Sequence, residues 1–129
     1  MEVLMSAVKE DYLSWLNINE RQAADVTVLE LEGNLIIGEG SSALRNALRR
    51  LIREGKKKVL LDLTKVNFID SNGIGELVSG LIAIKREDGQ LKLLNVTQKA
   101  LHVLDVTGLL SVFNVFEDEG KALNDFRAK

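Results

Sequence analysis

Short apolar runs and longer amphipathic segments alternate along the chain, and this alternation predicts the architecture. Residues 13–18 (LSWLNI) and 26–31 (VTVLEL) have the apolar content and spacing that are typical of strands. Gly33 and Asn34 then interrupt the pattern before the apolar run at residues 35–37. This break predicts a hairpin or a tight turn, followed by a third short strand.

Helical spacing follows from residue 42 to residue 54. One side of this segment is apolar and the other carries arginines, as in a helix that packs on a sheet; the apolar positions are Ala43, Leu44, Ala47, Leu48, Leu51 and Ile52. Ser41 or Ser42 is expected to cap the start of this helix through its hydroxyl group. Gly55 stands where a helix-ending glycine is common.

The rest of the chain repeats the alternation of strand and helix. Residues 59–63 form an apolar run typical of a strand buried on both faces, and residues 66–69 continue in extended form toward Asp70. The later elements are a helix at 72–86, a strand at 91–96, a helix from Thr97 to Gly108, a strand at 112–116 and a helix at 118–127. The predicted order, β-β-β-α-β-α-β-α-β-α, indicates a single α/β domain with a mixed β-sheet packed against α-helices.

Composition narrows the class of protein. A chain of 129 residues with 46% hydrophobic residues suits one globular domain. It has no cysteine, which excludes a disulfide, a thiolate metal site and a cysteine nucleophile. No apolar run approaches the roughly 18 residues of a membrane span, and the charged residues near the N-terminus argue against a secretory signal. We therefore expect a cytoplasmic protein without a membrane segment.

The charge distribution argues against a nucleic-acid partner, because the net charge is −2 and such partners usually require a basic face. One local cluster of basic residues stands apart from this balance: Arg45, Arg49, Arg50, Arg53, Lys56, Lys57 and Lys58. A solvated helix face accounts for its arginines. A docking patch for an acidic partner or for a membrane surface is the alternative.

Two further features bear on cofactor chemistry. Residues 38–43 match the G-x-G-x-x-A form of a dinucleotide-binding loop, and Asp62 follows at about the distance of a ribose-binding acid, roughly 20 residues. A chain of this length is too short for the complete two-half nucleotide fold. Only a small nucleotide-binding domain therefore stays as an alternative.

His102 is the only histidine, which makes a metal site or a Ser-His-Asp triad unexpected. No cofactor and no metal are expected.

The segment from residue 68 to residue 77 is the strongest candidate site. An apolar strand ends, polar residues turn the chain, and an amphipathic helix begins. Asp70, Ser71 or Asn72 can therefore cap this helix through a side-chain oxygen.

Two glycines follow in the first turn of the same helix. Gly73 and Gly75 each lower helix stability by roughly 1 kcal/mol, which a purely structural cap does not require. A phosphate on Ser71 would bring about −1.5 to −2 charges to a helix N-terminus, where an anion is accepted. A plain helix cap and a phosphorylation switch both stay open as interpretations.

The segment from Leu61 to Leu77 resembles the signature of STAS domains, specifically of bacterial anti-sigma-factor antagonists. In this family a D-S-x-G-x-G-x-L stretch joins a central strand to a helix, and a partner anti-sigma kinase phosphorylates its serine. The predicted element order from Leu13 to Phe126 also resembles the family.

The resemblance implies that Ser71 is the phosphoacceptor. The unphosphorylated form would bind an anti-sigma factor with serine kinase activity and free a sigma factor. Phosphorylation would end this binding, and a phosphatase would reset it, so that the chain would be a substrate and not an enzyme. The residues expected at the partner surface are Asp70, Ser71, Asn72, Gly73, Gly75 and Glu39.

One loop departs from the family pattern. Family members often carry an aspartate in a G-x-[LI]-D pattern, whereas this chain has Gly33-Asn34-Leu35-Ile36 and a longer loop, in which Glu39 offers a substitute charge. Residues 1–12 are expected to be an N-terminal extension and residues 13–129 the STAS domain. A non-catalytic STAS adaptor that docks a transporter or a signalling scaffold is the second hypothesis, and the oligomeric state stays open.

Overall fold

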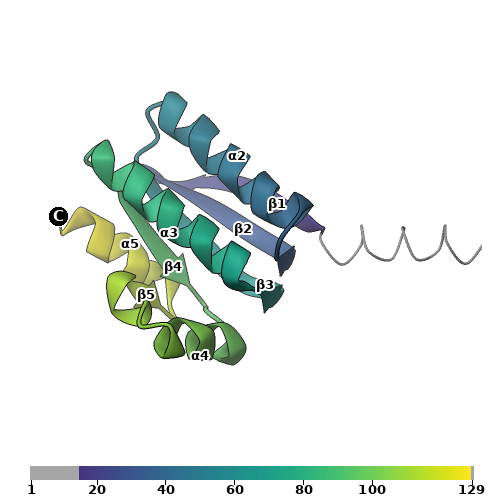
Figure 1. The fold of residues 1–129 in the computed structure, drawn as a ribbon. Coiled ribbons are helices and arrows are strands. Elements are labelled where there is room, and N and C mark those ends of the chain that lie inside the picture. Colours follow the sequence, from purple (N-terminus) through teal and green to yellow (C-terminus); the bar gives the residue numbers. More distant parts are fainter. Residues whose placement is uncertain (1–14, 129) are drawn as a thin grey trace, which may run out of the picture.

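Five strands form one mixed sheet in the computed structural model, which describes residues 15–128 (Figure 1). In their order across the sheet, the strands are β1 (Leu16–Ala23), β2 (Val26–Leu35), β3 (Lys58–Ile69), β4 (Gln90–Leu94) and β5 (Val115–Phe116). Only the β1–β2 pair is antiparallel among these. The helices are α2 (Glu39–Arg53), α3 (Ser71–Arg86), α4 (Gln98–Val106) and α5 (Glu119–Arg127), with a short 3-10 helix, η1 (Leu110–Val112). The predicted α/β class with a mixed sheet is confirmed.

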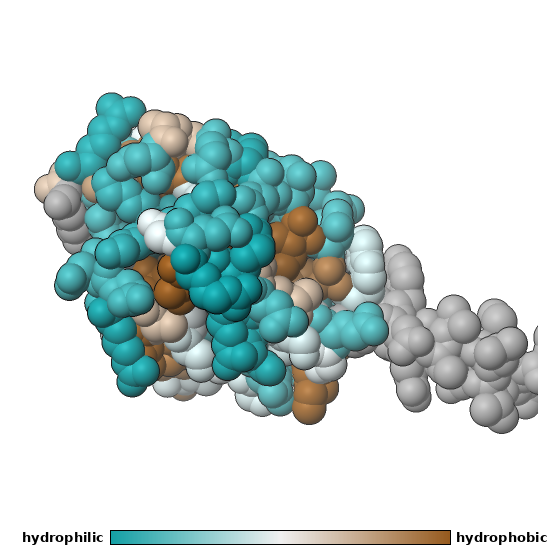
Figure 2. Space-filling model, turned by 90° about the horizontal axis from the view of Figure 1, so that it is seen from above, coloured by the Kyte–Doolittle hydropathy of each residue, from teal (hydrophilic) through white to brown (hydrophobic). Residues whose placement is uncertain are grey.

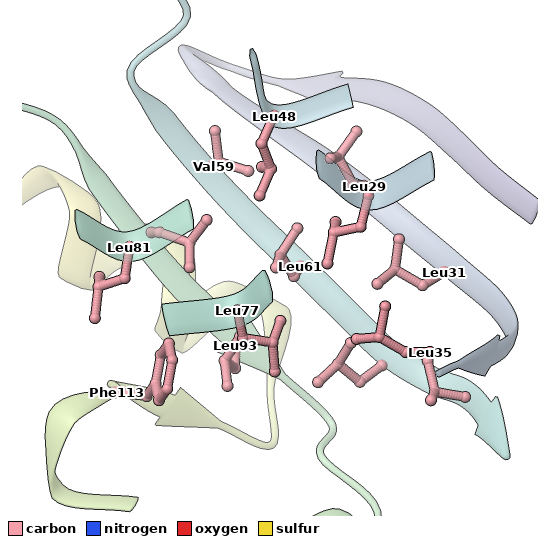
Figure 3. Packing of buried hydrophobic residues seen from close by; sticks show 14 of the residues in the cluster. Leu29, Leu31, Leu35, Leu48, Val59, Leu61, Leu77, Leu81, Leu93 and Phe113 are labelled. Atoms are coloured by element: carbon pink, nitrogen blue, oxygen red, sulfur yellow. The ribbon is translucent and has the colours of Figure 1, made fainter. Parts of the chain in front are cut away.

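Two hydrophobic clusters hold helices on opposite faces of the sheet. Successive strand residues point to opposite faces. Leu29 and Leu61 therefore join the larger cluster under α2 and α3 (Figure 3), while Val28 and Leu60 join a smaller one with Phe126 of α5. The helices contribute to the larger cluster Leu44, Leu48 and Leu51 of α2, Leu77, Leu81 and Ile84 of α3, and Leu104 of α4. Each fully buried leucine stabilises the fold by about 1.5–3 kcal/mol, which fixes α2 and α3 on the sheet.

The predicted turn at Gly33 and Asn34, and the separate third strand after it, are wrong. β2 runs unbroken through both residues to Leu35, with shifts in its register against β3 on either side of Gly33. Gly33 has φ of +122°, and a Cβ there would lie 2.4 Å from the carbonyl oxygen of Trp15. The glycine therefore permits a bulge inside a strand, and the hairpin lies earlier, between β1 and β2.

The predicted cap of α2 is also wrong. The helix begins at Glu39 behind Gly38, and no side chain caps it. The Ser41 hydroxyl donates instead to the carbonyl oxygen of Ile36 at 2.7 Å, and the Ser41 N–H donates to the same oxygen at 3.1 Å. Since only three residues separate β2 from α2, this backbone connection takes the place of a side-chain cap.

The other helix ends agree with the sequence patterns. The Thr97 hydroxyl accepts a hydrogen bond from the Ala100 N–H and caps α4. Gly55 and Gly108 follow α2 and α4 with positive φ values, as expected after a helix.

The strand predicted at residues 112–116 is mostly replaced by other structure. Residues Leu110–Val112 form η1, and Phe113 turns into the larger hydrophobic cluster. Only Val115 and Phe116 remain to pair with the end of β4, because burying the Phe113 ring draws the preceding chain out of the sheet.

An ion pair between a buried lysine and a half-buried aspartate joins α5 to the sheet. Lys92 of β4 is 1% exposed, and its ammonium donates to the Asp125 carboxylate at 2.6 Å. The same ammonium lies 5.0 Å from the centre of the Phe126 ring. An ammonium group this deeply buried requires a partner, because desolvation of a lone charge is expensive.

We predict different outcomes when the two members of this pair are changed. Asp125→Ala leaves a buried ammonium without its carboxylate and should destabilise the domain by about 3 kcal/mol. Lys92→Met removes the charge and fills a similar volume, so it should change stability by less than about 1.5 kcal/mol. Urea unfolding of both variants measures the difference, and equal destabilisation by the two would contradict this account of α5.

Candidate functional site

The candidate site lies where β2 and β3 end side by side. The two strands are parallel, and their last paired residues are Leu35 and Ile69. The chain then enters α2 after a short loop and α3 after a single residue, Asp70. Because parallel strands end at the same edge of a sheet, the loop at residues 36–38 and the start of α3 are neighbours.

Asp70 ties these two segments together. One carboxylate oxygen, Oδ1, accepts a hydrogen bond from the Gly73 N–H at 2.8 Å, so Asp70 is the cap of α3. The other oxygen, Oδ2, accepts from the Ile37 N–H at 2.9 Å, and the Asp70 N–H donates to the Leu35 carbonyl oxygen at 3.3 Å. Among the three candidate caps left open by the sequence, the structure selects Asp70.

Ser71 is left available for chemistry by this arrangement. It is the first residue of α3, its side chain is exposed, and its hydroxyl makes no hydrogen bond with any described residue. Asn72 is exposed beside it. The N–H groups at the first two positions of a helix have no partner within the helix, so an anion placed here meets two free donors and the positive end of the helix dipole.

The two glycines of the first turn have different reasons to be glycine. Gly73 is buried, and a Cβ there would lie 2.0 Å from the Leu35 carbonyl oxygen, so only glycine lets α3 approach the end of β2 this closely. Gly75 is exposed, and apart from its chain neighbours and the backbone of its own helix no described atom lies within 4 Å of the place its Cβ would occupy. Packing within the domain does not explain Gly75, which leaves a bare patch of backbone one turn from Ser71.

Two exposed apolar side chains accompany Ser71 at this end of the sheet. Ile37 is 65% exposed and Phe68 is 56% exposed. Ile37 is held by Asp70, and Phe68 precedes Ser71 by three residues. Phe68 lies at the start of the candidate segment 68–77, but the sequence patterns named neither Phe68 nor Ile37 as a partner-surface residue, because each continues an apolar run that is typical of the core.

Glu39 lies at the start of α2 and is exposed. No hydrogen bond or ion pair joins it to residues 70–75 within the part of the chain that the structure describes. It therefore belongs to the same end of the molecule without being part of the Asp70 network.

Behind the site, α2 and α3 are joined by Arg45 and Glu76, whose nearest nitrogen and oxygen atoms are 2.5 Å apart. The Glu76 carboxylate raises the pKa of the Arg45 guanidinium above its ordinary value through this hydrogen bond.

The basic cluster is largely a network of surface ion pairs. Its paired members are Arg45 with Glu76, Arg50 with Glu20 and Glu54, Lys56 with Glu20 and Glu54, and Lys58 with Asp25. The space-filling view from above shows a surface that is mostly hydrophilic, with hydrophobic residues in separate patches (Figure 2). This agrees with a solvated helix face.

The arrangement does not support the nucleotide-binding alternative. Asp62 pairs with Glu30 in the middle of the sheet, five residues before the end of β2, and its carboxylate accepts hydrogen bonds from Thr64. Its neighbours Leu61 and Leu63 face α2 and α3, so Asp62 points to the opposite face of the sheet from the 38–43 loop. The acid and the glycine loop of the proposed fingerprint are therefore apart.

Residues 15–128 contain no candidate metal centre and no helix that could cross a membrane. His102 is an exposed residue of α4, and these residues contain no group of three histidine or acidic side chains that could hold a metal ion. None of the helices in this range is long and apolar enough to cross a bilayer.

Comparison with known proteins places these features in a family. The family model described as the STAS domain matches residues 17–122. The chain is 25% identical over 100 residues to the anti-sigma-B factor antagonist of Bacillus subtilis, covering 78% of this chain and 90% of that one. A crystal structure from Thermotoga maritima, described as a candidate anti-sigma factor antagonist, has a TM-score of 0.80 at 24% identity and covers 85% of this chain and 94% of that chain. The phosphorylated form of the Bacillus cell fate determinant SpoIIAA has a TM-score of 0.68 at 19% identity, covering 88% of this chain and all of that one.

We predict opposite effects on stability for the same substitution at the two glycines. Gly73→Ala drives a methyl group into the Leu35 carbonyl oxygen and should destabilise the domain by at least about 2 kcal/mol. Gly75→Ala should stabilise it by up to about 1 kcal/mol, because alanine is the better helix former and has open space there. Thermal unfolding of the two variants checks the pair, and a Gly73→Ala variant as stable as the parent would contradict the close approach of α3 to β2.

A separate prediction concerns the two acceptors of Asp70. Asp70→Ala should lower the free energy of unfolding by about 1–2 kcal/mol through loss of the cap. Asp70→Asn keeps one acceptor oxygen for Gly73 but presents an amide donor toward Ile37, so the Ile37 N–H should lose protection from hydrogen exchange in both variants. Exchange measured residue by residue tests this, and an unchanged Ile37 N–H would show that Asp70 does not hold the 36–38 loop.

Proposed function

We propose that this chain, which belongs to the STAS domain family, is an anti-sigma factor antagonist whose partner binding is switched by phosphorylation of Ser71. The observation that carries the proposal is the exposed Ser71 hydroxyl, which makes no hydrogen bond within residues 15–128 and lies on the turn that Asp70 holds. STAS anti-sigma factor antagonists are non-catalytic regulators, so the chain is not an enzyme.

The unphosphorylated surface suits a protein partner. Gly75 offers bare backbone for close contact, and Ile37 adds exposed apolar area at the same end of the sheet. Aromatic and aliphatic groups at the centre of an interface carry much of its binding energy. In this proposal the partner is an anti-sigma factor with serine kinase activity, which releases its sigma factor in the cytoplasm when this surface is bound.

Phosphorylation would change this surface with little change in the fold. The kinase transfers the γ-phosphoryl group of ATP to the Ser71 oxygen, and about −1.5 to −2 charges then occupy the interface. The first N–H groups of α3 can receive the phosphate oxygens, so the helix stays capped while the partner loses contact through bulk and repulsion. A phosphatase that removes the phosphate would restore binding.

We predict that a serine kinase anti-sigma factor encoded beside this chain phosphorylates it at Ser71 alone. The purified proteins are incubated with Mg²⁺ and ATP, and the modified residue is mapped by mass spectrometry. Ser71→Ala should accept no phosphate yet keep its binding, since the change removes one small exposed group. Ser71→Asp should bind at least about tenfold more weakly, a loss of about 1.4 kcal/mol.

Ser111→Asp is the matched control, because Ser111 is exposed in η1, away from the β2 and β3 ends. It should bind like the parent chain. Phosphate at another residue, or undiminished binding by Ser71→Asp, would overturn the switch. Tight binding without any phosphorylation would instead favour the adaptor hypothesis.

A further inference from the structure

β3 extends beyond its neighbour on one side. The last residues paired between β3 and β4 are Asp62 and Leu94, after which the chain leaves the sheet for α4. Residues 63–69, which we call the β3 tail, therefore have a strand partner only on the β2 side among the residues described. On the other side they face α4.

An apolar groove of about 190 Å³ lies between the β3 tail and α4. Val66 and Ala100 are buried in it, and Phe68 is 56% exposed along its wall. The volume is below the roughly 300–1,000 Å³ of small-molecule sites. The groove therefore suits a single apolar side chain, the kind of anchor on which protein interfaces depend.

The charge of the groove points to the chemistry of its occupant. Lys99 is the one charged residue that lines it, and the Lys99 ammonium lies 5.4 Å from the centre of the Phe68 ring. The lining has no carboxylate, and Lys99 makes no ion pair with any residue in the described range. The aromatic ring holds this ammonium beside the opening, where it can receive a negative charge from outside the domain.

We propose that this groove is an anchor site for a partner protein, which inserts a leucine or aromatic side chain beside Phe68 and places a neighbouring carboxylate on Lys99. The inference rests on the proposed function, because Ile69, which lines the groove, is followed directly by Asp70, the cap of the helix that begins at Ser71. The anchor would fix the partner so that its remaining contacts fall on Ser71 and Gly75.

A random twelve-residue peptide display library, selected on the full chain, tests the groove without a known partner. Enriched peptides should share a leucine or aromatic residue next to Asp or Glu. In amide NMR spectra they should shift the signals of residues 66–69 and 99–103. Phe68→Ala and Lys99→Glu should each weaken the peptides at least tenfold. Both side chains are exposed, so the fold should be retained, and Lys121→Glu on α5 is the matched control with unchanged binding.

The outcomes separate this inference from the proposed function. The anchor-site proposal is overturned if the enriched peptides bind elsewhere, contain basic residues in place of acidic ones, or bind the Lys99→Glu variant as tightly as the parent chain. It is also overturned if no peptide is enriched. Self-association that depends on Phe68 would mean that a second copy is the occupant, which also overturns it. Ser71→Asp should leave peptide affinity within twofold. If Ser71 is phosphorylated but no peptide binds in the groove, only the anchor-site proposal is wrong. If peptides bind in the groove but Ser71 is not phosphorylated, only the phosphorylation switch is wrong.

Discussion

The functional end of the molecule depends on the two hydrogen bonds that the Asp70 carboxylate accepts. One oxygen caps α3 through the Gly73 N–H, and the other holds the Ile37 N–H of the loop after β2. These bonds join segments that are 33 residues apart in the sequence. Hydrogen bonds to a charged group contribute more than neutral ones, so a single side chain fixes the start of one helix and the path of a neighbouring loop.

This constraint explains how a serine can be both accessible and well placed. Asp70 caps the helix, and the Ser71 hydroxyl makes no hydrogen bond with the residues that the structure describes. Gly73 lets α3 pack against the Leu35 carbonyl oxygen at the end of β2. The first turn of α3 is therefore fixed both by this contact and by the Asp70 hydrogen bonds. A charge added at Ser71 would therefore lie on an exposed, rigidly held helix start. There it would alter the surface offered to a partner and leave the core packing intact.

Sequence patterns were sufficient for the order of most elements and for the Asp70–Gly75 turn. They succeeded at α3 and α4 because helix caps and apolar periodicity depend on residues close in sequence. They failed at Gly33, where the choice between a turn and a bulge depends on the carbonyl oxygen of Trp15, the residue before β1. They gave no packing reason for the paired glycines and left a plain cap and a switch both open, whereas Gly73 is required by a contact with β2. The exposure of Ile37 and Phe68 was not predicted, because an apolar residue near the end of a strand is expected in the core until its neighbours are known.

We propose that phosphorylation of Ser71 acts locally, because Asp70 holds the turn in a fixed position. Amide NMR spectra of the chain carrying phosphoserine at position 71, compared with the unmodified chain, test this most directly. We expect changes confined to residues 36–39 and 70–75, with the Gly73 and Ile37 N–H groups still protected from exchange. Changes spread through β2, β3 and the length of α3, or loss of that protection, would contradict it.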